Sequence, residues 1–507
     1  MGIKRESLVE PGLTPAGRLA ALAALTLLFL GVAAWNGFPL VFYDTGAYMA
    51  EGLSGAFFVE RSPVYSLFLP LTGAFHSLWL VAAAQSLMTA FIILELARVE
   101  APRLGLGRLL LIGAALMGLT GIGWYAGQIE PDCFTPLVVL GSYLLLFRFD
   151  AMTQWRRWTV IAITALAVAS HPSHFGLIGG LLIVAALLKS LFWFHPLRPS
   201  LAPARVARKE EEGGASALPA TGASPSGALR AEGEADMRVP VPKLWPCLSA
   251  LLLSLALVVT ANYFYTRTIF VSRAGSIFLL ARLMQDGIVQ RLLADTCPPQ
   301  ASSAKPPYSL CAYGAKLPRN ANAWIWGEHS SFHALGGFKR SDDEYGRIAR
   351  DSLARYPWMH LKAAVYDSAL QFLEFKTGDG IESQRAILEP GFRHSLPAQL
   401  PAYLAARQQT RRIRFDEINL VHVPVAVIAL LGVLLLLHHA AARRHWDAAV
   451  LPATVLLALL GNAIICGTFS NPHDRYQSRL MWMPVLVLLL ARAKDPRALQ
   501  PVREEGS

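Results

Sequence analysis

The sequence carries little charge for its length. Asp, Glu, Lys and Arg make up 16% of its 507 residues, whereas 54% are hydrophobic and the mean hydropathy is +0.39. Soluble domains carry about 25% charged residues. This balance excludes disorder over most of the chain and argues against a soluble enzyme. The net charge of +11 forms no basic stripe, so we expect no nucleic-acid partner.

Cysteine and the common catalytic motifs are scarce as well. The chain has five cysteines and no CxxC spacing, which disfavours both a disulfide scaffold and a structural zinc site. It has no GxGxxG, P-loop, HExxH or GxSxG motif in a supporting context. Chemistry with a soluble nucleotide cofactor is therefore disfavoured.

The sequence contains long runs of apolar residues. A membrane-spanning helix needs about 20 mostly apolar residues. Such runs occur at 17–35, 78–97, 109–125, 133–147, 155–170, 175–194, 244–264, 420–437, 448–467 and 480–491. The first run lacks a small-residue cleavage site, so we expect a retained anchor. The sequence predicts an all-α polytopic membrane protein with about ten transmembrane helices.

Basic residues cluster at alternate ends of these runs. The clusters are Lys4, Arg5 and Arg18; Arg98, Arg103 and Arg108; Arg148, Arg156 and Arg157; Arg443 and Arg444; and Arg492, Lys494 and Arg497. Positive loops stay in the cytoplasm, and ten spans with both ends inside place all five clusters there. We expect a multi-pass protein of the bacterial inner (cytoplasmic) membrane, with cytoplasmic N- and C-termini and membrane lipid around it.

Two stretches between the apolar runs differ in kind. Residues 196–243 hold seven prolines and no aromatic residue before the next span, which predicts a disordered cytoplasmic linker. Residues 265–419 are rich in aromatic residues, and we expect a mainly helical periplasmic segment there. A helical stretch over 343–375 should break at Pro357.

These boundaries predict five parts of the chain. They are an N-terminal transmembrane module with acidic outer loops (1–195), the linker (196–243), one transmembrane helix (244–264), the periplasmic segment (265–419), and C-terminal transmembrane helices with a cytoplasmic tail (420–507). An oxidising periplasm would let Cys297 and Cys311 pair as a disulfide, and the sequence leaves open whether they do.

The first outer loop places Asp44 directly after a span. A carboxylate at the edge of the lipid can act as a base on an acceptor hydroxyl or hold a divalent cation. Alternatively, Asp44 caps a short helix that starts at Thr45.

The second outer turn contains Glu130, Pro131 and Asp132. Carboxylates this close to hydrocarbon are costly and mark functional sites. The alternative is an ordinary helix start, where proline and acidic residues are favoured.

The remaining outer turns supply arginine and histidine. Arg475 and Tyr476 suit a phosphate or diphosphate, or they anchor the chain at the interface. His171 and His174 are either metal ligands or simply hydrated polar residues.

The order of these motifs resembles a known family. After the first helix come Asp44 and Tyr48, then RSPVYSLFL from Arg61, a helix ending in ELAR at 95–98, and IEPD at 129–132. Over about the first 195 residues this resembles the membrane glycosyltransferases of the GT-C fold, particularly protein O-mannosyltransferases and the bacterial lipid A aminoarabinose transferase. Two departures are Thr45, which follows Asp44 where the mannosyltransferases have an Asp-Glu pair, and the SHPSH run at 170–174.

The resemblance implies an inverting transfer of a sugar from a polyprenyl-phosphate donor to a lipid, glycan or protein acceptor at the periplasmic face. Asp44 would be the catalytic base, and Asp132 with Glu130 would match the second acidic motif. Asp44 and Asp132 would hold Mg²⁺ or Mn²⁺ if a cation is used.

Other residues complete the predicted site. Arg61, or Arg475 with Tyr476, would bind the donor phosphate. The substrate would be lined by Tyr48, Glu51, His171, His174 and His473. Two other classes of function remain open: a transporter or flippase for a lipid-linked glycan, and a non-catalytic membrane scaffold.

Overall fold

The protein is all-helical in a computed structural model that describes residues 12–194, 240–298, 305–340 and 343–494. Within these ranges there is no β-strand, and one isolated parallel bridge joins Leu40 to Gln128. The predicted all-α class is confirmed. Nearly all of the predicted linker lies outside the described residues.

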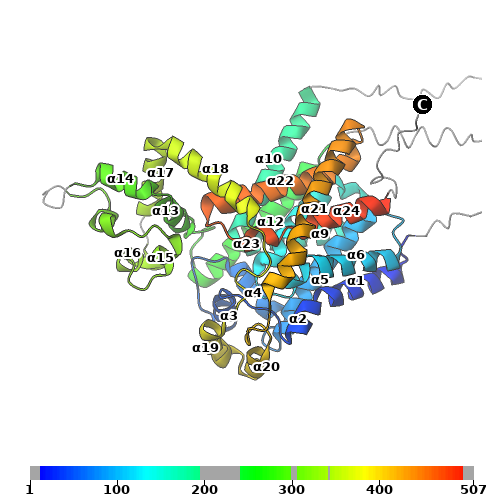
Figure 1. The fold of residues 1–507 in the computed structure, drawn as a ribbon, viewed down its shortest axis with the longest axis horizontal. Coiled ribbons are helices and arrows are strands. Elements are labelled where there is room, and N and C mark those ends of the chain that lie inside the picture. The colour runs from blue at the N-terminus through cyan, green and yellow to red at the C-terminus, as the bar shows by residue number, and fades with distance from the viewer. Residues whose placement is uncertain (1–11, 195–239, 299–304, 341–342, 495–507) are drawn as a thin grey trace, which may run out of the picture.

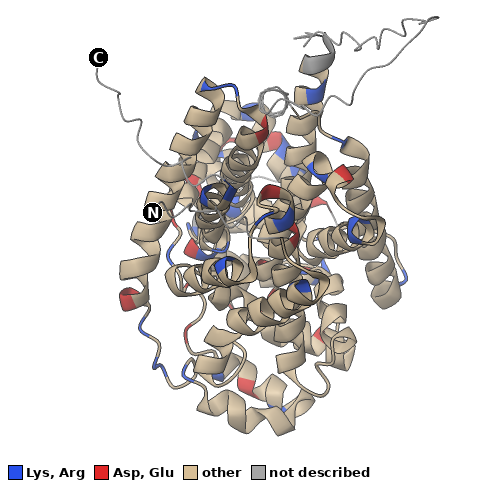
Figure 2. Ribbon diagram, turned by 90° about the vertical axis from the view of Figure 1, so that its right-hand side faces the viewer, with Lys and Arg blue, Asp and Glu red and all other residues tan. Residues whose placement is uncertain are grey.

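Six helical stretches are long and apolar enough to cross a membrane. They are α1 (Pro15–Phe29) continued by α2 (Gly31–Asn36), α5 (Leu78–Glu100), α10 (Pro172–Phe194), α12 (Leu244–Thr266), α21 (Phe415–Ala442) and α22 (Trp446–Phe469). Figure 2 shows long uncharged stretches along the helices, with Lys, Arg, Asp and Glu in short patches. These helices indicate a membrane protein.

The other four predicted spans correspond to shorter helices. These are α6 (Leu106–Leu119), α8 (Thr135–Phe147), α9 (Gln154–Ser170) and α24 (Trp482–Lys494), with 14, 13, 17 and 13 residues. Twelve of the residues in α8 are buried within the protein. A helix surrounded by other helices is apolar whether or not it spans the lipid, so hydropathy alone does not decide whether these four helices cross the membrane.

The two ends of the helix bundle collect different segments. At one end, Arg148 contacts Glu100 at 2.6 Å and Asp447 at 2.5 Å, which joins α5, α8 and α22. At the other end, the Leu40 carbonyl accepts from the Ile129 amide at 2.8 Å. Segments predicted to share a membrane side therefore contact one another.

The segment after α12 forms a separate lobe. It contains α13 (Gly275–Gln285), α14 (Ile288–Thr296), α15 (Ala321–Trp326), α16 (Ser331–Ala334) and α17 (Glu344–Arg355). The lobe has its own core around Trp324, and Figure 1 shows it to the left of the bundle. The predicted disulfide between Cys297 and Cys311 is present within it.

The rest of the predicted periplasmic segment returns to the bundle. Helix α18 (Pro357–Leu373) begins after Arg355 ends α17, so the predicted break at Pro357 is confirmed. Helices α19 (Arg385–Ser395) and α20 (Leu400–Ala405) contribute Phe392 and Tyr403 to the main core. Residues 265–419 are therefore not one structural body.

Helix α18 approaches α22 at a glycine. A Cβ atom on Gly467 would lie 2.6 Å from the Asp367 carbonyl oxygen, whereas one on Gly461 in the same helix would lie 3.8 Å from its nearest neighbour, on Leu177. The close backbone approach at Gly467 fixes α18, and the lobe that precedes it, against the bundle.

We predict that Gly467→Ala destabilises the protein by about 1–3 kcal/mol, because the methyl group would push the two backbones apart. The matched control, Gly461→Ala, should be neutral or stabilising by about 0.5–1 kcal/mol because alanine favours helix. Thermal unfolding in detergent measures both variants. Equal melting temperatures for the two would contradict the close packing.

Candidate functional site

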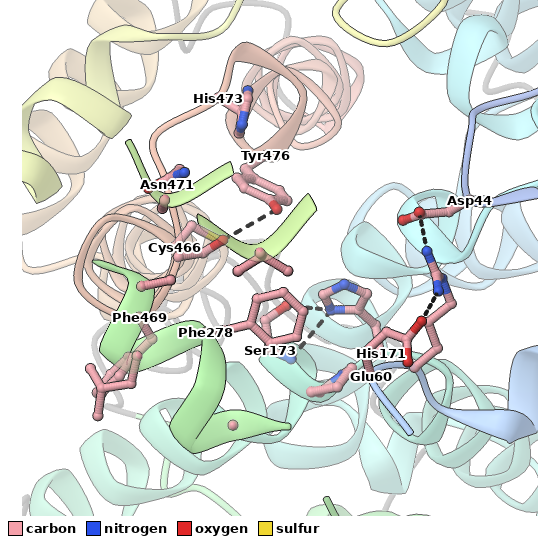
Figure 3. A pocket seen from close by; sticks show the side chains of 18 of the residues that line it. Asp44, Glu60, His171, Ser173, Phe278, Cys466, Phe469, Asn471, His473 and Tyr476 are labelled. Carbon is pink, nitrogen blue, oxygen red and sulfur yellow. Dashed lines mark hydrogen bonds and ion pairs between the residues drawn. The ribbon is translucent and has the colours of Figure 1, made fainter. Parts of the chain in front are cut away.

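A cavity of about 560 Å³ lies where the lobe meets the bundle. Its lining comes from the first outer loop, the start of α10, the lobe and the loop after α22 (Figure 3). The predicted site residues that line it are Asp44, Tyr48, Arg61, His171, His473, Arg475 and Tyr476. The first outer loop, the start of α10 and the loop after α22 are far apart in sequence, yet they lie together at this cavity and face the lobe.

Asp44 stands at the start of α3 (Thr45–Ser54) but makes no capping hydrogen bond with its side chain. Its Oδ1 instead accepts from Nη2 of Arg61 at 2.5 Å. Thr45 supplies local order, since its hydroxyl accepts from the Phe42 amide and donates to the Ile129 carbonyl. The geometry therefore does not support the capping alternative, and it leaves the carboxylate of Asp44 at the cavity.

Arg61 precedes α4 (Pro63–Leu71), which Ser62 caps by accepting from the Val64 amide. Nη2 of Arg61 binds Asp44, and Nη1 binds Glu60 at 2.6 Å. Both terminal nitrogens are thus engaged by carboxylates (Figure 3). Arg61 is better placed to orient Asp44 than to bind a phosphate.

Arg475, in α23 (Asp474–Ser478), is only 8% exposed yet lines the cavity. Its guanidinium lies 4.1 Å from the centroid of the Phe42 ring, and Nη2 donates to the Tyr476 hydroxyl at 3.2 Å. Nε and Nη1 have no hydrogen-bond partner in the described chain, although Asp132 lies 4.0 Å from Nη1. A buried guanidinium with unused donors is suited to binding an anion.

Asp132 and Glu130 lie behind the cavity and do not line it. Asp132 is ion-paired with the fully buried Arg479, which also donates to Asn462 of α22 at 3.3 Å. Burial, reinforced by the charges of Asp44 and Asp132, raises the pKa of Glu130 well above its usual range. The turn directs both acids into the protein. Contrary to the prediction, neither one therefore reaches the cavity in which a substrate would bind.

The predicted cation ligands do not fit Mg²⁺ or Mn²⁺. Asp44 is engaged by Arg61, and Asp132 by Arg479. No group of three or more His, Cys, Asp or Glu side chains with metal-binding geometry occurs within the described ranges. Hard divalent cations need several oxygen ligands, so we derive no step through a metal.

The two histidines of the SHPSH run have different environments. His171 lines the cavity, and burial together with the positive charge of Arg479 lowers its pKa to about 4, so it is neutral. His174 is fully buried and bonds Thr135 and the Ala167 carbonyl, both at 2.7 Å. His174 therefore ties α10 to α8 and α9 and does not line the cavity, contrary to the prediction.

Glu51 is buried beside the cavity but outside its lining. It accepts from the Ser66 hydroxyl and from the Phe58 amide. Its contacts fix the loop that leads to Arg61. Burial raises the pKa of Glu51 to about 7. Glu51 is therefore a positioning residue and not the predicted lining residue.

Several residues at the cavity were not predicted from the sequence. Phe278 of α13 and Trp326 of α15 line it from the lobe. Asp379 accepts from the Arg475 amide at 3.2 Å and lies 3.5 Å from His473. These residues share no motif or periodicity, and only the long-range packing of the chain brings them together.

Comparisons with known proteins add no relative: no protein-family profile, curated protein or solved structure matches this chain. The family suggested by the sequence motifs therefore stays a prediction.

We predict that Glu51 makes stability depend on pH. Its pKa of about 7 exceeds the ordinary value of 4.5, so its contribution to stability is complete below pH 4.5 and is lost as the pH rises through 7. Glu51→Gln mimics the protonated acid and should melt at a higher temperature than the wild type at pH 8. Melting temperatures between pH 5 and 8 measure the difference.

The control is Glu382→Gln, since Glu382 is exposed. This variant should keep the wild-type dependence of melting temperature on pH. If Glu51→Gln also keeps that dependence, the carboxyl of Glu51 is ionised in the folded protein.

Proposed function

We propose that the protein is a membrane glycosyltransferase that moves a sugar from a polyprenyl-phosphate donor to a lipid, glycan or protein acceptor. The supporting observation is Arg475, a buried arginine with two unpartnered nitrogens that lines a cavity together with the Asp44 carboxylate. Figure 3 shows Asp44 and Tyr476 on opposite sides of this cavity. An anion and an acceptor hydroxyl can therefore be bound across the same space.

The donor phosphate would bind Arg475 and Tyr476. Nε and Nη1 of the guanidinium have no hydrogen-bond partner among the described residues, and the Tyr476 hydroxyl already lies within hydrogen-bond distance of Nη2. Charge-assisted hydrogen bonds of this kind neutralise the negative charge that grows on the departing phosphate.

Asp44 would act as the base. As the acceptor oxygen bonds to the anomeric carbon, its proton passes to the Asp44 carboxylate. The bond from that carbon to the phosphate oxygen breaks, and polyprenyl phosphate leaves with the electron pair. Attack from the face opposite the leaving group inverts the anomeric carbon. Arg61 keeps the carboxylate in place.

The apolar part of the lining supports a lipid-linked donor. Phe469 at the end of α22 and Trp326 of α15 line the cavity and are both exposed in the protein alone. Exposed apolar side chains at the mouth of a polar site suit the hydrocarbon chain of a membrane substrate.

We further propose that the cavity faces the periplasm of a bacterial inner membrane, with both termini in the cytoplasm and α6, α8, α9 and α24 completing ten crossings. The Cys297–Cys311 disulfide supports an oxidising compartment for the lobe. Arg148 and its neighbours at the other end of the bundle fit the cytoplasmic side.

A transporter or flippase for a lipid-linked glycan is the second candidate, and a scaffold the third. Transporters place their sites near the membrane midplane, at broken helices. Here the polar residues gather at the ends of helices, in the turns before α3 and after α22. That position favours an enzyme.

We predict that Asp44→Asn lowers sugar transfer by about 10²–10⁴-fold, because the amide cannot accept the proton. Membranes carrying the full chain are incubated with labelled polyprenyl-phosphate sugars, and label in non-prenyl acceptors is counted. The matched control, Glu382→Gln, removes an exposed carboxylate that does not line the cavity and should stay within a few-fold of wild type. Unchanged transfer by Asp44→Asn would exclude the proposed base.

We predict that Arg475→Gln weakens binding of polyprenyl phosphate by about 10- to 100-fold, the equivalent of one or two charged hydrogen bonds. Binding to purified protein is measured by ligand-dependent fluorescence. The control is Arg393→Gln on α19, an exposed arginine, which should bind as the wild type does. Normal binding by Arg475→Gln would place the phosphate elsewhere.

A further inference from the structure

A second cavity, of about 220 Å³, opens at the end of the bundle away from the proposed active site. It lies between the start of α1, the end of α5 and the turn into α6. Its lining includes Leu13, Arg18, Arg98, Pro102, Leu104 and Leu109. The proposed transfer reaction uses none of these residues.

Among the described residues, positive charge exceeds negative charge around this cavity. Nη1 of Arg98 donates to Oε1 of Glu95 at 3.2 Å, and Nε of Arg156 lies 3.6 Å from the same oxygen. Arg18 lies near enough to repel both other arginines. Within the described ranges, its side chain donates one hydrogen bond, to the Thr14 carbonyl. Glu95 is thus ion-paired with two guanidinium groups, and among the described residues no ion pair joins Arg18 to a carboxylate.

The charges are partly removed from water. Arg156 is only 5% exposed, and its Nε has no hydrogen-bond partner among the described residues. Burying like charges together is costly unless an anion joins them. Arginine binds phosphate oxygens well because its donors form a planar fork.

The surroundings of this cavity are those of a membrane interface. Leu19 of α1 and Leu111 of α6 are each 70% exposed in the protein alone, as expected of side chains that face lipid. Trp155 and Trp158, next to Arg156 in α9, are also exposed. Tryptophan is enriched where the hydrocarbon meets the headgroups.

We propose that Arg18 and Arg98, which line this cavity, and Arg156, which shares Glu95 with Arg98, form a binding site for a phosphate group. The phosphate would be presented by an anionic phospholipid in the leaflet opposite the proposed active site. Basic pockets between transmembrane helices recognise such headgroups. Leu19 and Leu111 would contact the acyl chains, and the arginines would bind the phosphate.

The test uses the full chain, purified in neutral detergent and freed of lipid. Phosphatidylglycerol, phosphatidylcholine and inorganic phosphate are added separately, and the melting temperature is measured. We expect phosphatidylglycerol to raise it by several degrees and the other two to have little effect, because only a ligand of the folded state stabilises. An equal rise with phosphatidylcholine would overturn the proposal. If inorganic phosphate alone raised the melting temperature as much as phosphatidylglycerol does, the proposal that a lipid supplies the phosphate group would be wrong.

Arg18→Gln tests the cluster without breaking an ion pair. We expect it to lose at least half of the rise caused by phosphatidylglycerol. The control, Arg443→Gln, removes an exposed arginine from another loop on the same predicted side and should keep the whole rise. If Arg18→Gln melts too early for this assay, native mass spectrometry counts bound phosphatidylglycerol, and a count equal to that of the wild type would overturn the proposal.

Discussion

Burial of two arginines beside one carboxylate organises the end of the bundle that holds the cavity. Asp132 binds the fully buried Arg479 and lies 4.0 Å from Arg475. Asn462 of α22 accepts from Arg479 and donates to Gln477 at 2.9 Å. Because leaving any of these charges unpaired in the interior would be costly, the turn before α8, the loop after α22 and α22 itself are held in one arrangement. The cavity is the space that this arrangement leaves in front of Arg475.

The sequence indicated much of this site because its chemistry is local. Asp44 and Arg475 each stand beside a long apolar run, where a charged residue is costly and therefore informative. The same reasoning did not reveal which acid would meet the cavity. Glu51 and Asp132 looked equally exposed in the sequence, yet packing turns both inward. The lobe contributes Phe278 and Trp326 through contacts that no local pattern encodes.

The number of spans is left open for a related physical reason. Hydropathy records whether a residue avoids water, and both lipid and the protein interior meet that condition. Helix α8 is almost wholly buried by its neighbours, whereas α21 leaves most of its apolar surface outward, with 28% of its most apolar stretch buried. Only the three-dimensional packing separates these two cases, although both appear as apolar runs in the sequence.

Arg61 and Arg475 show why a residue type alone does not define a role. Both line the same cavity, Arg475 buried and Arg61 partly exposed, and each lies near an aromatic ring. Arg61 has two carboxylates on its terminal nitrogens, so its charge is already balanced. Arg475 shares Asp132 with Arg479 and keeps two nitrogens without hydrogen bonds. Two arginines that share one carboxylate leave a net positive charge, and an anionic group of a substrate is what would balance it. The count of partners is therefore the reason why we propose Arg475 as the anion-binding residue and Arg61 as the residue that holds Asp44.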